Sequence, residues 1–231
     1  MTHLLLWYLV TLIISFSVIV PTTEFFWSFR SGGVAYARVV GVAFLSLLVW
    51  FTLKLDISIP VIWASLFWLL LFFLLSAGMV FRNRSIVERL WSQRTKVLVT
   101  ESIWIALFGV ILLARSLAPD ATATEKPMDL MIITSIFRSE LIPPPDPWFS
   151  GAALSYHHLG HLSAVIIGKL SQQSIGMIFN LVLASSAATA GAVAAILAID
   201  FLPDLRQLSQ RKSALILVST GFITLCTLFL L

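Results

Sequence analysis

The sequence is poor in charge. Lys, Arg, Asp and Glu together make up 11% of its 231 residues, whereas 59% of the residues are apolar. A soluble domain carries about 25% charged residues, so an ordinary soluble globular domain is excluded. Crossing the roughly 30 Å of hydrocarbon in a bilayer takes about 20 apolar residues at 1.5 Å each. The composition therefore predicts a protein embedded in a lipid bilayer.

Several motifs that mark well-known chemistry are also missing. The chain has no Gly-rich phosphate-binding loop, no Gly-x-Ser-x-Gly nucleophile motif and no Cys-x-x-Cys pair. Its one cysteine, Cys226, excludes a disulfide within the chain. No polar segment carries a basic stripe with interleaved aromatic residues, so we expect no nucleic-acid partner. The net charge of +4 fits contact with lipid headgroups instead.

The apolar runs predict an all-α, polytopic helical membrane protein with about seven spans. We expect the spans at about residues 4–20, 34–53, 60–81, 97–117, 156–170, 175–199 and 214–231. They divide the chain into a four-span membrane region (1–117), an extracytoplasmic loop (118–155) and a three-span membrane region (156–231). Because the last apolar run reaches Leu231 without a polar tail, we expect the chain to continue in a longer parent protein.

The orientation follows from the distribution of charge in the loops. Five basic residues gather in the linker 82–96, whereas acidic residues gather in the loop 118–155. Short loops on the cytoplasmic side of a membrane carry an excess of Lys and Arg. We therefore expect the linker in the cytoplasm and the acidic loop outside, although the basic residues of the loop 200–213 then also face outward.

The acidic loop is the strongest functional candidate. Five of the eleven acidic residues of the chain lie within it, namely Asp120, Glu125, Asp129, Glu140 and Asp146. Apolar residues at helical spacing predict a short helix over Met128–Arg138 that lies on the membrane surface, and Glu125 and Asp129 share one of its faces. The two acids either cap the helix N-terminus, where the dipole favours them, or form a carboxylate pair. Such a pair binds a divalent metal ion, the candidate cofactor, or acts as a general base.

A proline-rich segment, Pro143–Trp148, follows the predicted surface helix. Its four prolines force a stiff, extended backbone. Asp146 is either a turn former or a third catalytic acid, and Trp148 anchors the segment at the interface. We expect the segment to fold back over the helix, so that Glu125, Asp129 and Asp146 converge on one pocket.

Three histidines stand where the next apolar run begins. His157 and His161 are four residues apart, a spacing that suits a metal or porphyrin ligand pair. Hydrogen bonding at the interface is the alternative role for each of them. We take His161 as the candidate metal ligand and expect His157 to line the mouth of the pocket.

These segments together resemble a prokaryotic family of membrane proteins of unknown function, named YYY after a Tyr-Tyr-Tyr run. Its typical pattern reads T-E-K-P-M-D, then an apolar helix ending in R-S, then P-P-P-D-P-W-x-x-G, then Y-Y-Y-F-G. The matching residues here are Thr124 to Asp129, Arg138-Ser139, Pro143 to Trp148, Gly151 and Tyr156 to Gly160. The resemblance covers roughly Thr124 to Ala190, with histidines replacing two tyrosines. It implies a multi-pass protein of the prokaryotic cytoplasmic membrane.

The order of these segments is in turn similar to that in GT-C type membrane glycosyltransferases. Those enzymes place a catalytic acid just outside a span, followed by a surface helix and a proline-containing stretch that enters the next span. By this resemblance Glu125 takes the acid position and acts as general base on a polyprenyl-phosphate-linked sugar at the outer face. The implied substrate-binding residues are Lys126, Arg138, Trp148, Tyr156, His157 and His158, with Lys126 or Arg138 contacting the phosphate.

Two other classes of protein remain open. The chain could serve as a non-catalytic scaffold or transporter subunit beside other membrane subunits, or as a pigment- or haem-binding subunit that uses a histidine. The glycosyltransferase interpretation predicts a cavity that opens to lipid and converges on Glu125. A scaffold predicts that Glu125 is bonded to backbone and that no cavity is present. A pigment protein requires apolar space above a histidine ring.

Overall fold

The structure is a computed structural model that describes residues 2–29, 31–55, 59–122 and 125–201. Within these ranges the chain is helical and contains no β-strand, as predicted, apart from one isolated bridge between Pro145 and Ala153. The helices are α1 (Thr2–Ser17), α2 (Ile19–Phe25), η1 (Val34–Tyr36), α3 (Ala37–Lys54), α4 (Val61–Arg82), α5 (Ser85–Ser92), α6 (Arg94–Leu117), α7 (Lys126–Ser139), α8 (Leu159–Leu170) and α9 (Ile175–Phe201).

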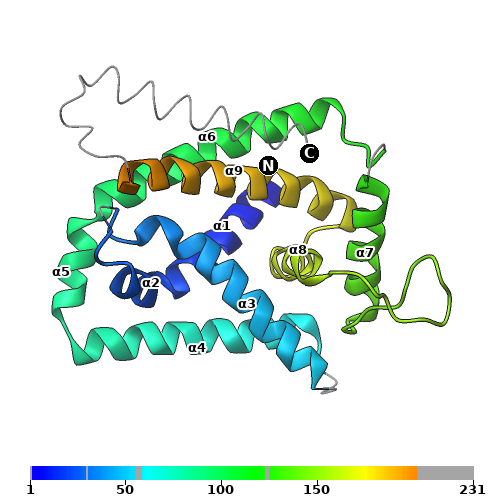
Figure 1. Ribbon diagram of the computed structural model, residues 1–231, viewed down its shortest axis with the longest axis horizontal. Helices are drawn as coiled ribbons and strands as arrows, with labels where there is room; N and C mark the ends of the chain where they lie inside the picture. Colours follow the sequence, from blue (N-terminus) through cyan, green and yellow to red (C-terminus); the bar gives the residue numbers. More distant parts are fainter. Residues whose placement is uncertain (1, 30, 56–58, 123–124, 202–231) are drawn as a thin grey trace.

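Four helices are long and apolar enough to cross a membrane. They are α4, α6, α9 and the continuous segment formed by η1 and α3. Each contains an apolar stretch of spanning length. The pair α1 and α2 makes a fifth candidate that is bent by 50° at the break between them. In Figure 1, α4, α6 and α9 run in nearly the same direction across the molecule. The described residues thus contain four candidate spans, or five if the bent pair forms one span.

The described residues do not confirm the seven spans expected from hydropathy. The run at 156–170 forms only α8, which has 12 residues and is therefore about 18 Å long, too short to cross 30 Å of hydrocarbon. Its apolar residues are buried against other helices; Leu162, Val165 and Ile166 are fully enclosed. Hydropathy does not distinguish burial in protein from burial in lipid. The expected span at 214–231 lies outside the described residues.

The helix predicted over Met128–Arg138 is present as α7, and its position on the membrane surface stays a prediction. Pro127 lies in its first turn, where the missing N–H costs nothing. The helix ends at Ser139 and is followed by Glu140, whose φ of 56° is left-handed. Figure 1 shows α5 and α7 at opposite ends of the long helices, each running across their direction. This arrangement suits two segments on opposite faces of a membrane.

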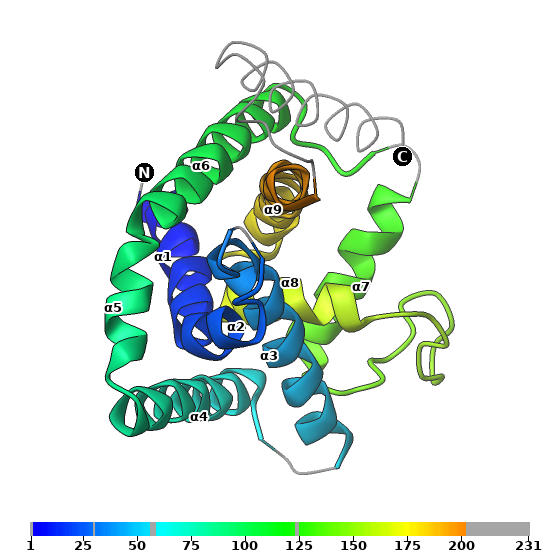
Figure 2. The ribbon, with the colours of Figure 1, turned by 60° about the vertical axis from the view of Figure 1, so that its left-hand side comes forward.

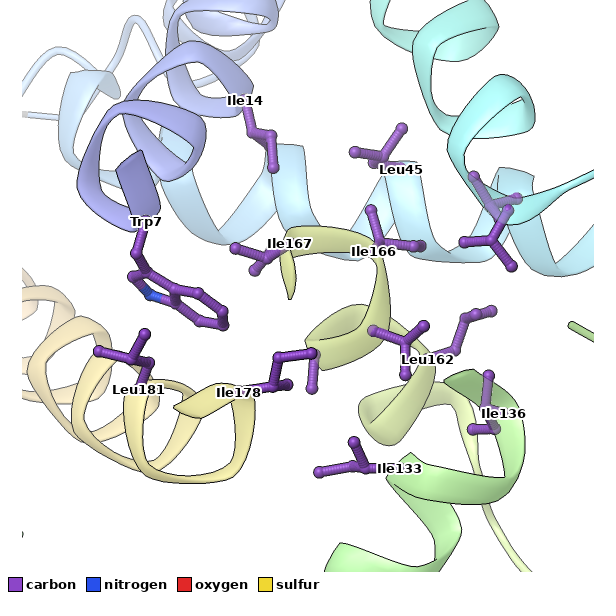
Figure 3. Packing of buried hydrophobic residues seen from close by; sticks show 14 of the residues in the cluster. Trp7, Ile14, Leu45, Ile133, Ile136, Leu162, Ile166, Ile167, Ile178 and Leu181 are labelled. Atoms are coloured by element: carbon purple, nitrogen blue, oxygen red, sulfur yellow. The ribbon is translucent and has the colours of Figure 1, made fainter. Parts of the chain in front are cut away.

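The core of the molecule is built around α8. Figure 2 shows this short helix surrounded by longer ones, and Figure 3 shows its buried side chains in contact with those of four neighbours. The central residues are Trp7 and Ile14 of α1, Leu45 of α3, Ile133 and Ile136 of α7, Leu162, Ile166 and Ile167 of α8, and Ile178 and Leu181 of α9. Because α7 and α8 share this core, the polar residues at their ends are held on a rigid base.

Helices α1 and α3 pack closely at Gly41. A Cβ atom at this position would lie 2.8 Å from the backbone oxygen of Ile14. We expect Gly41→Val to lower the free energy of unfolding by about 1–3 kcal/mol, because the two backbones must separate. Thermal unfolding in detergent micelles measures the effect. Gly78→Val is the matched control, since nothing lies within 4 Å of that position on α4. Equal melting temperatures for the two variants would contradict the close packing of α1 on α3.

Candidate functional site

The first turns of α7 and α8 meet through Asp129 and His161. Asp129 Oδ1 lies 2.9 Å from His161 Nε2. An ionised carboxylate only accepts hydrogen bonds, so Nε2 carries the hydrogen. The histidine side chain is 12% exposed and the aspartate side chain 37%. The histidine is thus fixed inside the protein and holds a carboxylate that reaches solvent.

Glu125 directly precedes α7 and is exposed. It stands at the N-cap position, yet its side chain makes no capping hydrogen bond. The helix dipole favours a negative charge here, and the carboxylate remains free to contact a substrate. The capping role considered for Glu125 therefore has no hydrogen bond to support it.

The two candidate phosphate ligands are separated by the length of α7. Lys126 is the first residue of the helix and Arg138 belongs to its last turn. Twelve residues at 1.5 Å place them about 18 Å apart along the axis. They cannot bind the same phosphate, and only Lys126 lies beside Glu125 and Asp129.

Asp146 is held in the turn that it forms. Its Oδ1 accepts hydrogen bonds from the backbone N–H groups of Trp148 (2.8 Å) and Phe149 (3.0 Å), which is the turn-forming role considered for it. Ser135 Oγ donates to the carbonyl of Pro145 at 2.6 Å. This contact ties the proline-rich segment to the middle of α7, about 9 Å along the axis from Asp129. The structure therefore does not bring Asp146 to the helix end where Glu125 stands, and Trp148 points outward as an exposed side chain.

The histidines before α8 have different environments. Trp50 Nε1 donates to His158 Nε2 at 3.1 Å, and His158 Nδ1 lies 2.9 Å from the carbonyl of Tyr156. Since an indole N–H only donates and a carbonyl only accepts, His158 is neutral with its hydrogen on Nδ1. His157 is exposed, with its ring 4.0 Å from that of Tyr156 and 6.1 Å from that of His161. His158 thus joins α8 to α3, while His157 and Tyr156 lie beside the Asp129–His161 pair.

A metal site is not assembled among the residues that the structure describes. No three His, Cys, Asp or Glu side chains stand close enough together there to hold an ion. Asp129 and His161 would supply two ligands. The metal role of His161 stays a prediction.

The fourth acidic residue of the loop, Glu140, holds helices together. Its Oε2 accepts the backbone N–H of Val61 at 2.8 Å, at the start of α4. Its Oε1 pairs with Lys169 of α8, whose Nζ lies 4.4 Å from the centre of the Phe137 ring. Glu140 therefore joins the end of α7 to both α4 and α8.

We expect Glu140→Gln to lower the free energy of unfolding by about 1–2 kcal/mol. The amide keeps an acceptor for Val61 N–H, but the charge-assisted hydrogen bond to Lys169 is lost. Thermal unfolding in detergent micelles measures the loss. The control is Asp120→Asn, at an exposed position of the same loop; if both variants melt like the wild type, Glu140 does not stabilise the fold.

The structure also shows a polar cluster that the sequence did not predict. Arg38 Nη2 lies 2.8 Å from Glu101 Oε2, and Tyr8 OH donates to the same oxygen at 3.1 Å. The guanidinium carbon lies 4.1 Å from the centre of the Trp104 ring. The sequence did offer an indication of this cluster, because Arg38 and Glu101 are charged residues within the apolar runs of α3 and α6. Ionisable residues in membrane spans usually serve a function.

Arg38 also lines a cavity of about 700 Å³, whereas Glu101 does not. Helices α1, α3, α6, α8 and α9 line it, mainly with apolar side chains. Neither Glu125 nor any histidine is among its lining residues. The cavity therefore matches neither the expectation for a glycosyltransferase nor that for a pigment protein. The scaffold expectation is not met either, since Glu125 has no capping bond and a cavity is present.

Four or five apolar helices of spanning length, packed on a short buried helix, define a multi-pass α-helical membrane protein. Within this class, the chain belongs to the family described as uncharacterized membrane protein (DUF2298), whose model matches residues 4–230. No curated protein and no solved structure matches the chain. The match supports the resemblance to a family of uncharacterised membrane proteins and leaves the similarity to glycosyltransferases as a proposal.

Proposed function

We propose that the protein is a membrane glycosyltransferase that takes its sugar from a polyprenyl-phosphate donor at the outer face. One observation carries the proposal. Asp129, oriented by His161 at 2.9 Å, stands on the first turn of α7 beside the uncapped carboxylate of Glu125. Two accessible carboxylates on a helix that crosses the end of the spans are suited to deprotonating an acceptor hydroxyl at the interface.

The residues at the start of α7 divide the chemistry among them. The acceptor oxygen attacks the anomeric carbon of the donor, the bond from that carbon to the phosphate oxygen breaks, and polyprenyl phosphate leaves. Glu125 takes the proton of the acceptor hydroxyl. Lys126 and the free N–H groups of the helix N-terminus stabilise the negative charge on the leaving phosphate. Asp129, fixed by His161, binds the acceptor or the sugar.

The test uses the full-length protein in liposomes that contain polyprenyl-phosphate-[³H]mannose or polyprenyl-phosphate-[³H]glucose. We expect one of these donors to be consumed, with release of free polyprenyl phosphate and transfer of the label. Asp120→Asn, which changes an exposed acid outside the site, should transfer at the wild-type rate. If folded protein consumes neither donor and releases no polyprenyl phosphate, the proposal fails.

A second candidate is a non-catalytic scaffold or transporter subunit. It is favoured by the structural partners of two loop acids, since Glu140 joins three helices and Asp146 holds a turn. A scaffold should co-purify with other membrane subunits in defined proportion. Substitution of Glu125 should then leave every measured property unchanged.

A further inference from the structure

The cavity between α3, α8 and α9 has the dimensions of a ligand site. Its volume of about 700 Å³ lies within the range of about 300–1,000 Å³ that is typical of small-molecule pockets. We call it the apolar slot. Along α9 it extends from Val182 to Val193, which corresponds to about 16 Å of helix. An extended hydrocarbon chain fits such a space.

Arg38 and Leu159 mark the two ends of the slot. Arg38 packs on Trp104, whose Nε1 donates to Thr189 of α9 at 2.8 Å. The hydrogen bond from Trp50 to His158 places the start of α8 beside the C-terminal half of α3. A guanidinium therefore lies at one end of the slot, and the apolar first residue of α8 lies at the other.

Arg38 has hydrogen-bonding capacity that the described residues do not use. Its side chain is only 8% exposed, and its Nε is buried without a hydrogen-bond partner there. Leaving a buried donor unpaired is costly, more so for a charged group. Of the guanidinium nitrogens, Glu101 accepts a hydrogen bond only from Nη2. An acceptor beside the guanidinium would add a second charge-assisted hydrogen bond without displacing Glu101.

Arg38 is the only charged residue among the described residues that line the slot. A ligand whose hydrocarbon chain fills the slot can therefore place an acidic group beside a positive charge only at Arg38. The planar guanidinium also matches the geometry of a carboxylate.

We propose that the apolar slot binds a long-chain fatty acid. Its carboxyl group accepts hydrogen bonds from Arg38, and its chain extends along α3 and α9 toward Leu159. This site is separate from the α7 site and does not depend on glycosyl transfer.

Photocrosslinking with a diazirine-bearing palmitate tests the proposal, using the full chain in phosphatidylcholine nanodiscs. We expect labelled peptides from α3 and α9. Unlabelled palmitate should compete at least 10-fold better than hexadecane, because only the acid supplies a charge-assisted hydrogen bond to Arg38. Equal competition by hexadecane, or equal labelling of the lipid-exposed face of α4, would overturn the assignment.

Two variants locate the ligand. Ala190→Phe fills the slot, because Ala190 lines it, and should reduce labelling about 10-fold. Ala106→Phe adds the same bulk at an exposed position of α6 that is not among the lining residues and should label like the wild type. The double variant Arg38→Met/Glu101→Gln should still label, with no preference left for palmitate over hexadecane. Wild-type labelling of Ala190→Phe, or a retained preference in the double variant, would contradict the site.

Discussion

Glu125→Gln is expected to lower the rate of sugar transfer about 10²–10⁴-fold, the usual cost of removing a general base. The amide preserves the shape of the side chain but cannot take the acceptor proton. The melting temperature should barely change, because Glu125 is exposed and makes no capping hydrogen bond. Transfer of the tritiated sugar from the donor in proteoliposomes measures the rate.

The neighbouring carboxylate provides the comparison for this experiment. Asp129→Asn keeps an acceptor for His161 Nε2 but removes the negative charge, so it should also slow transfer. Wild-type transfer by Glu125→Gln, together with loss of transfer in Asp129→Asn, would move the base from Glu125 to Asp129. Normal transfer by both variants would show that these carboxylates are not catalytic, whatever donor the protein uses.

Arg38→Met alone is expected to be the most destabilising of these substitutions, by about 3–5 kcal/mol. It leaves the carboxylate of Glu101, whose side chain is 18% exposed, without its positive partner, and an uncompensated buried charge is costly. The stacking of the guanidinium on Trp104 at 4.1 Å is lost as well. Thermal unfolding in detergent micelles, together with the yield of folded protein, measures the effect.

The double variant Arg38→Met/Glu101→Gln is the control for this prediction. It removes both charges, so no unpaired charge remains and most of the stability should return. Tyr8 can still donate its hydrogen bond to the amide oxygen at position 101. If the single variant is as stable as the double variant, the Glu101 carboxylate does not need the positive charge of Arg38 to be tolerated inside the protein.

The two experiments address regions of different character. Glu125 and Asp129 are accessible at the end of the helix bundle, where we expect the loss of a charge to slow sugar transfer with little effect on stability. Arg38 and Glu101 lie among apolar helices, where loss of one charge strands the other. Substitutions of Glu125 or Asp129 should therefore lower activity more than stability, whereas Arg38→Met should lower stability.

Much of the local structure was determined by the sequence alone. Apolar runs about 20 residues long predicted α3, α4, α6 and α9, because each such helix satisfies its own backbone hydrogen bonds and exposes apolar side chains. Helical spacing of apolar residues likewise predicted α7 within two residues at its N-terminal end and one at its C-terminal end. These features depend on residues close together in the chain.

Only the tertiary structure decided what depends on distant residues. An apolar run such as 156–170 looks the same whether protein or lipid surrounds it, and packing against α1, α3, α7 and α9 made α8 a short buried helix. The partners of the polar residues were equally unpredictable, since Arg38 pairs with Glu101, Trp50 with His158 and Asp129 with His161. Each contact joins residues that are 32 or more positions apart in the chain, and the sequence alone does not say which of its distant residues meet in space.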